Sequence, residues 1–471
     1  MRARLLIVLV GVISGCVHYT PKPLAPEDTA RQLETRTLTD NGLRKFFESI
    51  ASETSHWPRE SWDLGELTVA ALYFQPSLEV VRAEWSAASA GIQTARARPN
   101  PTLTAGPGYN FNASGFTPWL PFGNLEWPIE TAGKRRYRVA HAEHLSDSAR
   151  LKINTTAWQI RSRLRSALVD FVAASERQTL LSDQIALQGR AVGLLEQRAA
   201  TGAISIPEIT PARLALQKLR QDESDARSQR TEARARLGEA VGVPVVALDD
   251  IMLIFDLSAV PAEVSRLTAR DARRQALLER ADILAGLSDY AASQSALQLE
   301  IAKQYPDVRL ASGYQLDNGE NKWTLGIGIE LPVLNRNQGP IAEAEARRAL
   351  AAVRFEALQA TIIAEVDRAV AVYRTAADIV TQAGEVVAVQ HQQLRSVEDQ
   401  FKAGAADGLE LVNAQIELAS SKIAFVIAEA RMQQAFGSLV DAVQDPWDFE
   451  QLAHVTSSPP DEHHPSDRVV P

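Results

Sequence analysis

The stretch QPSLEVVRAEWSAASAGIQTARARPNPTLTAGPGY (residues 75–109) decides the fold, because it occurs again as RADILAGLSDYAASQSALQLEIAKQYPDVRLASGY (residues 280–314). In both versions a helical composition, rich in Ala, Leu, Gln, Glu and Arg taken together, ends at a proline, Pro101 or Pro306, and alternating residues follow. A proline disfavours helix in the residue before it, and alternation is typical of a strand. Each copy is therefore predicted to change from helix to strand at its proline.

Two further matches follow at nearly the same spacing. EWPIETAG (126–133) aligns with ELPVLNRN (330–337), and a turn later in each copy aligns as well. The aligned pairs are Pro128 with Pro332, Gly202 with Gly404, and Glu208 with Glu410. Ordered matches at one spacing indicate an internal duplication, and this spacing is too long for a solenoid. We therefore predict two large half-domains within one fold.

The duplication divides the chain into six predicted segments. These are a signal peptide (1–15), a lipid-anchored N-terminal segment (16–64), a first repeat (65–245), a connector (246–267), a second repeat (268–446) and a tail (447–471). The tail is acidic and rich in proline, so it is predicted to be disordered.

Long helices make up most of each predicted repeat. Residues 134–200 contain two glycines and no proline, and residues 340–403 are similar. At 1.5 Å per residue the first would be a rod of roughly 100 Å, and its narrow apolar stripe is typical of coiled coils. Each rod is expected to reverse at a glycine into a return helix. The other predicted helices cover residues 77–97, 207–241, 264–303 and 409–443.

Four strands are predicted, two in each copy. The clearest is 322–331, where apolar and small or polar residues alternate after the hairpin signal DNGEN (317–321), and residues 112–117 join the first pair. About ten residues suit a tilted strand that crosses a bilayer. Several chains would have to close such a barrel, and a soluble sheet with one buried face is the alternative. Aromatic residues placed as an interfacial girdle are Tyr109, Trp119, Trp127, Tyr314 and Trp323.

The N-terminus, MRARLLIVLVGVISGC, has two arginines, an apolar run and small residues before the only cysteine. This pattern is typical of a secretory signal peptide. Its ending resembles the bacterial lipobox, which implies that Cys16 is acylated and becomes the mature N-terminus. Val17 follows in place of the aspartate that often retains lipoproteins in the inner membrane, so the outer membrane is favoured. An ordinary signal peptide with an incidental cysteine is the alternative.

The composition of the 471 residues excludes several classes of protein. A net charge of −9 argues against a protein that coats nucleic acid, and a single cysteine excludes internal disulfides. After the signal peptide no stretch approaches ~18 uninterrupted apolar residues, so no membrane-spanning helix is predicted. No catalytic constellation indicates an enzyme, and AGKRR (132–136) lacks the upstream glycine of a phosphate loop. No cofactor is predicted.

Two histidine pairs are weak candidates for metal binding. His463 and His464 lie in the tail without a scaffold, and His141 and His144 lie at spacing i, i+3 on a predicted helix. A solvated role is the preferred interpretation of both pairs, so no metal site is predicted. Four basic residues precede His141 at the start of the rod predicted over 134–200. They are expected to lie at the base of a barrel or to hold this helix start to its neighbours: Lys134, Arg135, Arg136 and Arg138.

The repeats and several motifs resemble those of the TolC-type outer-membrane efflux proteins over essentially the whole mature chain. EWPIETAGKRRYRVAHAE (126–143) and LPVLNRNQGPIAEAEA (331–346) are similar to strand-to-helix motifs of the cobalt–zinc–cadmium resistance branch, and PNPTL (99–103) and CVHYTPKP (16–23) also fit. The resemblance implies a mostly α fold with a small β part, in which long coiled-coil helices form a tunnel. Four transmembrane strands per chain would close a twelve-stranded barrel in a trimer.

The resemblance also implies roles for single residues. The N-terminal segment, the connector and the C-terminal region would form an equatorial belt, and the turns at Gly202 and Gly404 would be periplasmic tips that dock an adaptor. Asp407 is the first candidate for a tunnel constriction, followed by Glu208 and Glu410, and a solvated turn aspartate is the alternative. The prolines that would redirect the chain between tunnel and barrel are Pro101, Pro128, Pro306 and Pro332.

The function that the resemblance implies is that of a passive exit duct in a tripartite efflux system. The duct would be a lipid-anchored homotrimer of the outer membrane with a periplasmic extension. Its partners would be a periplasmic adaptor and an inner-membrane pump of the resistance-nodulation-division type. Heavy-metal cations are the expected substrate, and drugs or other small molecules are the alternative. A periplasmic coiled-coil lipoprotein without a pore and a surface enzyme are the rival classes.

Overall fold

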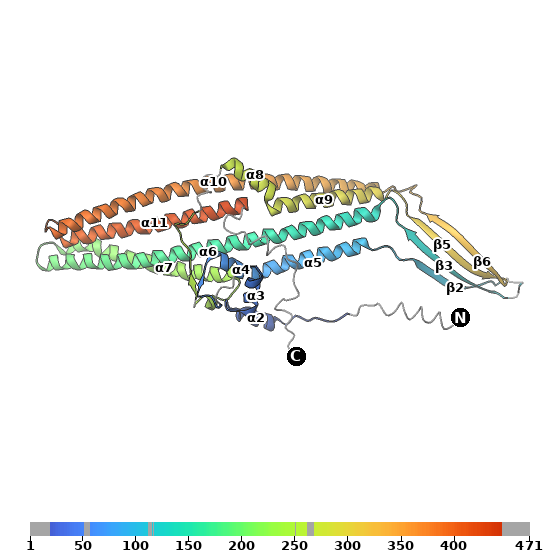
Figure 1. The fold of residues 1–471 in the computed structure, drawn as a ribbon, viewed down its shortest axis with the longest axis horizontal. Helices are drawn as coiled ribbons and strands as arrows, with labels where there is room; N and C mark the ends of the chain where they lie inside the picture. The colour runs from blue at the N-terminus through green and yellow to red at the C-terminus, as the bar shows by residue number, and fades with distance from the viewer. Residues whose placement is uncertain are drawn as a thin grey trace.

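The molecule is elongated, with the tips of long helices at one end and a small sheet at the other (Figure 1). It is seen in a computed structural model that describes residues 19–50, 57–111, 115, 117–249, 251–260 and 268–444. Each half contains two helices, two strands, a long helix and a return helix in that order. Cys16, the tail from residue 447 and its two histidines lie outside the described residues.

The four long strands form one antiparallel sheet in the order β2-β3-β5-β6. Their bounds are Thr102–Tyr109 (β2), Trp119–Ile129 (β3), Val308–Asp317 (β5) and Glu320–Ile329 (β6). The predicted hairpin is confirmed, because Asp317 pairs with Glu320, and Asn318 and Gly319 between them have φ angles of 49° and 85°. Two residues with positive φ are what a type I′ turn requires. β6 begins two residues earlier than predicted because pairing continues up to this turn.

The two predicted rods are confirmed as α6 (Lys134–Ala200, 67 residues) and α10 (Gln338–Lys402, 65 residues). α6 continues through η1 (Ile206–Ile209) into α7 (Thr210–Val241), and α10 turns back into α11 (Gly408–Val443). α7 packs on α6, α6 on α11 and α11 on α10, so the four helices form one layer in that order. By length and composition alone α11 is apolar enough to cross a membrane, but it packs inside this layer.

The single helix predicted over residues 264–303 is wrong. The described part of this range forms α8 (Ala269–Glu279) and α9 (Ala281–Ala302), with a break at Arg280. Arg280 has an extended backbone, with φ −59° and ψ 132°, and its buried Nη1 donates a hydrogen bond to the Ala442 carbonyl of α11 at 2.9 Å. A contact to the return helix therefore stabilises a break that composition does not reveal.

The first half contains the equivalent break at Gln75, between α4 (Leu64–Phe74) and α5 (Pro76–Arg96). The Gln75 Nε2 donates to the carbonyls of Glu239 and Ala240 on α7, at 2.6 and 2.8 Å. Gln75 and Arg280 are aligned positions of the duplication. Both halves thus use a polar side chain at the break to reach their own return helix.

Smaller elements lie beside the middle of the helix layer (Figure 1). They are α2 (Pro26–Glu34), α3 (Asn41–Ile50), β1 (Ser61–Trp62), η2 (Val245–Leu248) and β4 (Met252–Leu253). One buried core joins α3 and α4 to α6 and α7 and includes Leu67 and Leu164, and a second joins α8 to α10 and α11 and includes Phe436. β1 and β4 pair in parallel and so connect the N-terminal segment with the connector.

Candidate functional site

The sheet has one apolar face, and that face is exposed. The register places Ile327 beside Leu310 and Leu310 beside Trp127, so these residues share a face. On the same face Leu325 and Ile327 are 79% and 69% exposed. The other face carries mainly polar or small residues, among them Thr104, Asn124, Glu126, Arg309, Lys322 and Thr324, with Leu120 and Phe122 as apolar members. A sheet of this kind suits a wall between lipid and water.

Four of the predicted girdle residues lie in two ring pairs toward the hairpin ends of the strands. The ring centroids of Tyr109 and Trp119 are 5.0 Å apart, and those of Tyr314 and Trp323 are 4.9 Å apart. Both pairs lie directly across neighbouring strands, on the apolar face. Trp127 lies on this face nearer the helices. Aromatic bands at two levels are typical of the two interfaces of a membrane.

Both edges of the sheet are open in the part of the chain that the structure describes. β2 and β6 are the outer strands, and each has one neighbouring strand. A long open edge presents unpaired N–H and C=O groups that pair readily with another strand. In a bilayer these groups must be satisfied, because no water is present to bind them. The sheet is therefore incomplete as a membrane element without further strands.

The boundary prolines lie at the transitions between helices and sheet. Pro101 directly precedes β2, and Pro306 lies two residues before β5. Pro128 is the last residue but one of β3, and Pro332 follows the end of β6. Their positions agree with a redirection of the chain, a role that stays a prediction.

Asp307 joins the two halves at the base of the sheet. Its carboxylate accepts hydrogen bonds from the Thr131 backbone N–H at 2.9 Å and from the Lys134 Nζ at 2.7 Å. Burial alone would raise the pKa of Asp307, but the bonds from Lys134 and Thr131 together lower it. The first strand-to-helix junction is therefore fixed to the second helix-to-strand junction.

Arg135 and Arg138 fix the start of α6 to the end of α5. Arg138 donates to the Glu130 carboxylate at 2.6 Å and to the Ala95 carbonyl at 3.0 Å, and Arg135 donates to the Arg96 carbonyl at 2.8 Å. The hydrogen bond to Glu130 raises the pKa of Arg138. The prediction that these basic residues tether the helix start is confirmed for Lys134, Arg135 and Arg138. Arg136 instead lies over the ring of its neighbour Tyr137.

Both helical tips combine a glycine turn with a capping box. Gly202 and Gly404 have φ angles of 78° and 75°, which glycine adopts without strain. Glu208 belongs to a capping box at the start of η1, and Asp407 and Glu410 form one at the start of α11. All three constriction candidates therefore bind backbone N–H groups at helix starts.

Asp407 has a partner that the sequence does not indicate. Arg198, in the last turn of α6, donates to its carboxylate and so connects the two tips across 209 residues of sequence. The backbone N–H of Glu410 and the Arg198 guanidinium lower the pKa of Asp407. The Asp407 side chain is 49% exposed although it binds Arg198. A carboxylate that is held in place and still exposed is compatible with a position in a narrow opening.

Gln433 of α11 holds the connector against the helix layer. Its buried side chain donates to the carbonyls of Leu257 and Ala259 at 2.9 and 2.8 Å and accepts a hydrogen bond from Arg165 of α6 at 2.8 Å. Nothing local in the sequence marks this residue, because its partners lie more than 170 positions away.

Three carboxylates surround this contact, one from each participating segment: Glu176 of α6, Asp256 of the connector and Glu429 of α11. Burial raises the pKa of Glu429, and the charges of Glu176 and Asp256 raise it further. Burial and the charge of Asp256 also raise the pKa of Glu176. Hydrogen bonds from Ser258 lower the pKa of Asp256. The connector therefore lies on a group of mutually repelling acids.

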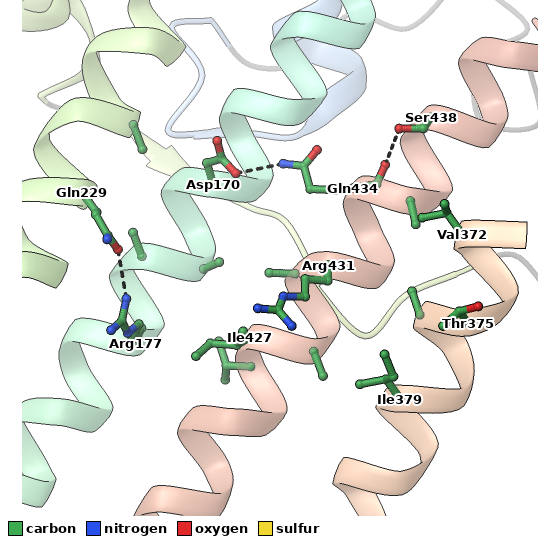
Figure 2. Close-up of a pocket in the computed structure, with 18 of the residues that line it drawn as sticks. Asp170, Arg177, Gln229, Val372, Thr375, Ile379, Ile427, Arg431, Gln434 and Ser438 are labelled. Carbon is green, nitrogen blue, oxygen red and sulfur yellow. Dashed lines mark hydrogen bonds between the residues drawn. The ribbon is translucent and has the colours of Figure 1, made fainter. Parts of the chain in front are cut away.

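A recess of about 920 Å³ is lined by α6, α7, α10 and α11 together. Figure 2 shows Arg431 of α11 between the lining residues of α6 and those of α10. Arg177 of α6 donates to the Gln229 side chain of α7 at 3.0 Å. Most other lining residues are alanine, valine or isoleucine. The recess is thus apolar with a few basic groups.

One histidine of the predicted pair on α6 contacts the neighbouring helix α9. His141 Nδ1 lies 2.8 Å from the Ala292 carbonyl of α9. Within the described ranges there is no group of three or more His, Cys, Asp and Glu side chains that could hold a metal ion.

The comparisons with known proteins agree with this geometry. A family model described as "Outer membrane efflux protein" matches residues 67–243 and 272–443. The cobalt-zinc-cadmium resistance protein CzcC of Cupriavidus metallidurans is 24% identical over 396 residues, which is 80% of this chain and 90% of CzcC.

Solved structures show the same fold. The outer membrane protein VceC of Vibrio cholerae matches with a TM-score of 0.65 and 20% identity over 81% of this chain and 95% of VceC. The outer-membrane channel OprN matches with a TM-score of 0.66 and 17% identity over 91% of this chain and 98% of OprN. The predicted fold class, mostly helical with a small four-stranded sheet, is confirmed. Because the two family matches together cover most of its length, this chain belongs to the outer membrane efflux protein family.

Proposed function

We propose that this chain forms the passive outer-membrane duct of an efflux system. The exposed apolar face of the sheet, together with the open edges of β2 and β6, carries the proposal. Three copies of the four-stranded sheet would pair edge to edge into a twelve-stranded barrel, with apolar side chains toward lipid and polar ones toward the lumen. The three helix layers would continue the barrel as a tunnel into the periplasm.

The duct would work with two partners. An inner-membrane pump, of the resistance-nodulation-division type, would supply the energy, and a periplasmic adaptor would connect the pump to the tips at Gly202 and Gly404. The glycine turns and the capping boxes support this role, because each tip is a short turn that is hydrogen-bonded to the start of the following helix. At these tips the carboxylates of Asp407, Glu208 and Glu410 are the proposed constriction.

Each segment of the chain would have its own part in the proposed duct. Residues 1–15 would be removed as a signal peptide and Cys16 would carry the lipid anchor, because acyl chains hold the N-terminus at the membrane stably when more than one is present. The segments 65–245 and 268–446 would each supply two strands and two tunnel helices. The segments 16–64 and 246–267, together with the C-terminal region, would form the belt around the tunnel.

Heavy-metal cations are the proposed cargo, because CzcC is named for resistance to cobalt, zinc and cadmium. Organic small molecules are a second candidate, favoured by the recess of about 920 Å³, which has the size of a small-molecule site. The two are separated by the sensitivity of a strain that lacks this chain. Sensitivity to metals with unchanged resistance to drugs supports the first, and the reverse result supports the second.

Conductance in a planar lipid bilayer tests the duct. We expect the purified full-length chain to form heat-resistant trimers in detergent and to give discrete conductance steps when it is added to the bilayer. A pore-free coiled-coil lipoprotein would give neither. A monomer without conductance would therefore contradict the duct and leave that rival class.

A further inference from the structure

We infer that the recess between α6, α7, α10 and α11 is a binding subsite for amphiphilic organic anions on their way through the duct. The inference rests on the proposed duct and concerns its second candidate cargo, organic small molecules, which it narrows to organic anions.

The recess lies on the side of the helix layer that faces away from the connector. The four helices lie side by side in the order α7, α6, α11, α10, and the single recess touches all four (Figure 2). On α11 the recess is lined by Arg431, whereas Gln433, two residues later and so about 200° around the helix, holds the connector. The core with α4 uses other positions of α6, such as Leu164 and Leu168, whereas the recess uses Asp170 and Arg177. In the proposed trimer the connector belongs to the belt around the tunnel, so the opposite side of each layer would line the tunnel.

The lining has a surplus of positive charge. Arg177, Arg236 and Arg431 stand against one acid, Asp170. Asp170 already lies 3.1 Å from the Arg236 guanidinium and accepts a hydrogen bond from Gln434 at 2.9 Å. Two guanidinium groups in each chain are thus left without a carboxylate in the recess, and a trimer would bring three such pairs into one tunnel.

These two guanidinium groups have donors to spare. Arg177 gives one hydrogen bond to Gln229, but its Nε is buried and has no hydrogen-bond partner among the described residues. A buried donor without a partner is unfavourable, so an anion that draws the Arg177 side chain into the recess would gain this hydrogen bond. Arg431 is exposed into the recess and makes no ion pair or hydrogen bond with any described residue. A guanidinium presents its donors in a planar fork that fits carboxylate, sulfonate and phosphate groups.

The remaining lining determines the body of the ligand. Val372 and Ile379 of α10 are 51% and 42% exposed, and they line the recess together with Val426 and Ile427 of α11. Apolar walls beside a small number of charged groups are typical of small-molecule sites. The ligand class that fits both parts is a molecule with a flat apolar body and an anionic head.

A second recess, of about 650 Å³, does not share the surplus of positive charge found in the first recess. It is lined by α6, α9 and α10 nearer the sheet. Its basic residues Lys152, Arg347 and Arg354 stand against four acids, Asp282, Asp289, Glu300 and Glu343. The surplus of positive charge is therefore a property of the first recess, and it would attract anions at that level, most strongly at low salt.

Calorimetric titration of the full-length protein in detergent tests the subsite, with 2-naphthalenesulfonate as the probe and 2-naphthylmethylammonium as its cationic counterpart. We expect the sulfonate to bind in preference to the ammonium, and Arg431→Gln to weaken sulfonate binding by about tenfold, the effect of one lost hydrogen bond to a charged group. Arg431→Lys should retain part of the affinity. Arg190→Gln is the matched control, because Arg190 is exposed on α6 outside the recess.

Equal affinity of the wild type and Arg431→Gln for the sulfonate, or stronger binding of the ammonium, would overturn the subsite. The same samples are measured in the planar bilayer, which separates the two proposals. Conductance with binding that does not depend on Arg431 leaves the duct standing and removes the subsite. Binding that depends on Arg431 without conductance leaves the subsite standing and removes the duct.

Discussion

Asp407 shows how one carboxylate serves two structures at once. It caps α11 through the N–H groups of Leu409 and Glu410, at 2.7 and 3.0 Å, and it accepts a hydrogen bond from Arg198 of the neighbouring tip. Removing it therefore changes both the start of a helix and the charge of the tip. The two effects need separate substitutions.

Asp407→Ala is expected to lower the local stability of α11 by about 1 kcal/mol, because an N-cap is lost. If the side chain lines the constriction, the same change raises single-channel conductance. Asp407→Asn keeps an oxygen that can cap the helix but removes the charge, so it separates the two effects. Conductance that is unchanged in both variants would exclude Asp407 as a constriction residue.

Glu429 gives a prediction with a defined direction in pH. Because burial raises its pKa in the folded chain, the folded state binds more protons than the unfolded state above the ordinary value of 4.5. Stability is therefore lost as the pH rises from that value through the raised pKa. Glu429→Gln should reduce this loss, so its thermal midpoint should fall less than that of the wild type between about pH 4 and pH 8.

Glu417→Gln is the control for this experiment, because Glu417 is exposed on the same helix. Its thermal midpoint should follow the wild type across the whole pH range. Parallel curves for the wild type and Glu429→Gln would show that the acids around the connector do not influence stability.

At this scale the sequence predicts residues whose role is local. Prolines and glycines act through their own backbone, so Pro101, Gly202 and Gly404 could be placed from sequence spacing alone. Arg198 and Gln433 could not, because their partners are 209 and 268 residues away in sequence. Only the fold brings such pairs together.

Among the elements, the base of the sheet depends on a contact between the two halves. Asp307→Asn would remove the ion pair with Lys134, whose side chain is only 11% exposed. We expect a loss of about 1 kcal/mol, because the pair is partly buried and Lys134 loses a charged acceptor. Since the pKa of Asp307 is lowered, this stabilisation is present above its ordinary pKa and is lost as the pH falls through the folded value.

Hydrogen exchange of the amides around Thr131 and Lys134 measures this effect. Exchange should become faster in Asp307→Asn than in the wild type at neutral pH, and the difference should shrink in acid. Asp289→Asn is the control, because its contact with Lys152 is 4.0 Å long and about half exposed on both sides. Equal exchange in Asp307→Asn and the control would contradict the role of Asp307.

The elements themselves were largely predictable. Long uninterrupted patterns gave α6 and α10 to within two residues, because propensity and periodicity agree over many turns. The break at Arg280 was missed, because the residues on both sides favour helix and the cause lies in α11. Local preference decides an element except where a distant side chain overrides it.

At the scale of the whole molecule, the acyl anchor proposed at Cys16 and the assembly of the trimer can be tested separately. Cys16→Ser should release part of the protein from outer-membrane fractions during alkaline extraction, because the acyl anchor is absent. The trimers should persist, because edge-to-edge strands and packed helix layers hold them. Unboiled gel electrophoresis checks this second point. Loss of trimers in Cys16→Ser would show that the anchor takes part in assembly.

The overall plan was predictable because the chain is duplicated. Aligned motifs in the two copies predicted a repeated order of helix, hairpin, rod and return helix, and the structure has that order. The sequence of helices across the layer and the charge of the recess were not predictable. Both depend on which faces of the four long helices turn toward one another. The apolar stripes of these helices are too narrow to determine which faces meet.

The open edges of the sheet also determine when it can form. A four-stranded sheet whose apolar face is bare cannot persist in water, and its edges would pair with any strand they meet. In the proposed trimer, barrel closure would require three molecules to meet, and its rate should rise steeply with chain concentration at the bilayer. The helix layer of one chain already has buried cores of its own, so it can fold before the barrel closes. If synthesis is faster than delivery to the outer membrane, chains with folded helices and unpaired strands would accumulate. These strands would make the chains prone to aggregation.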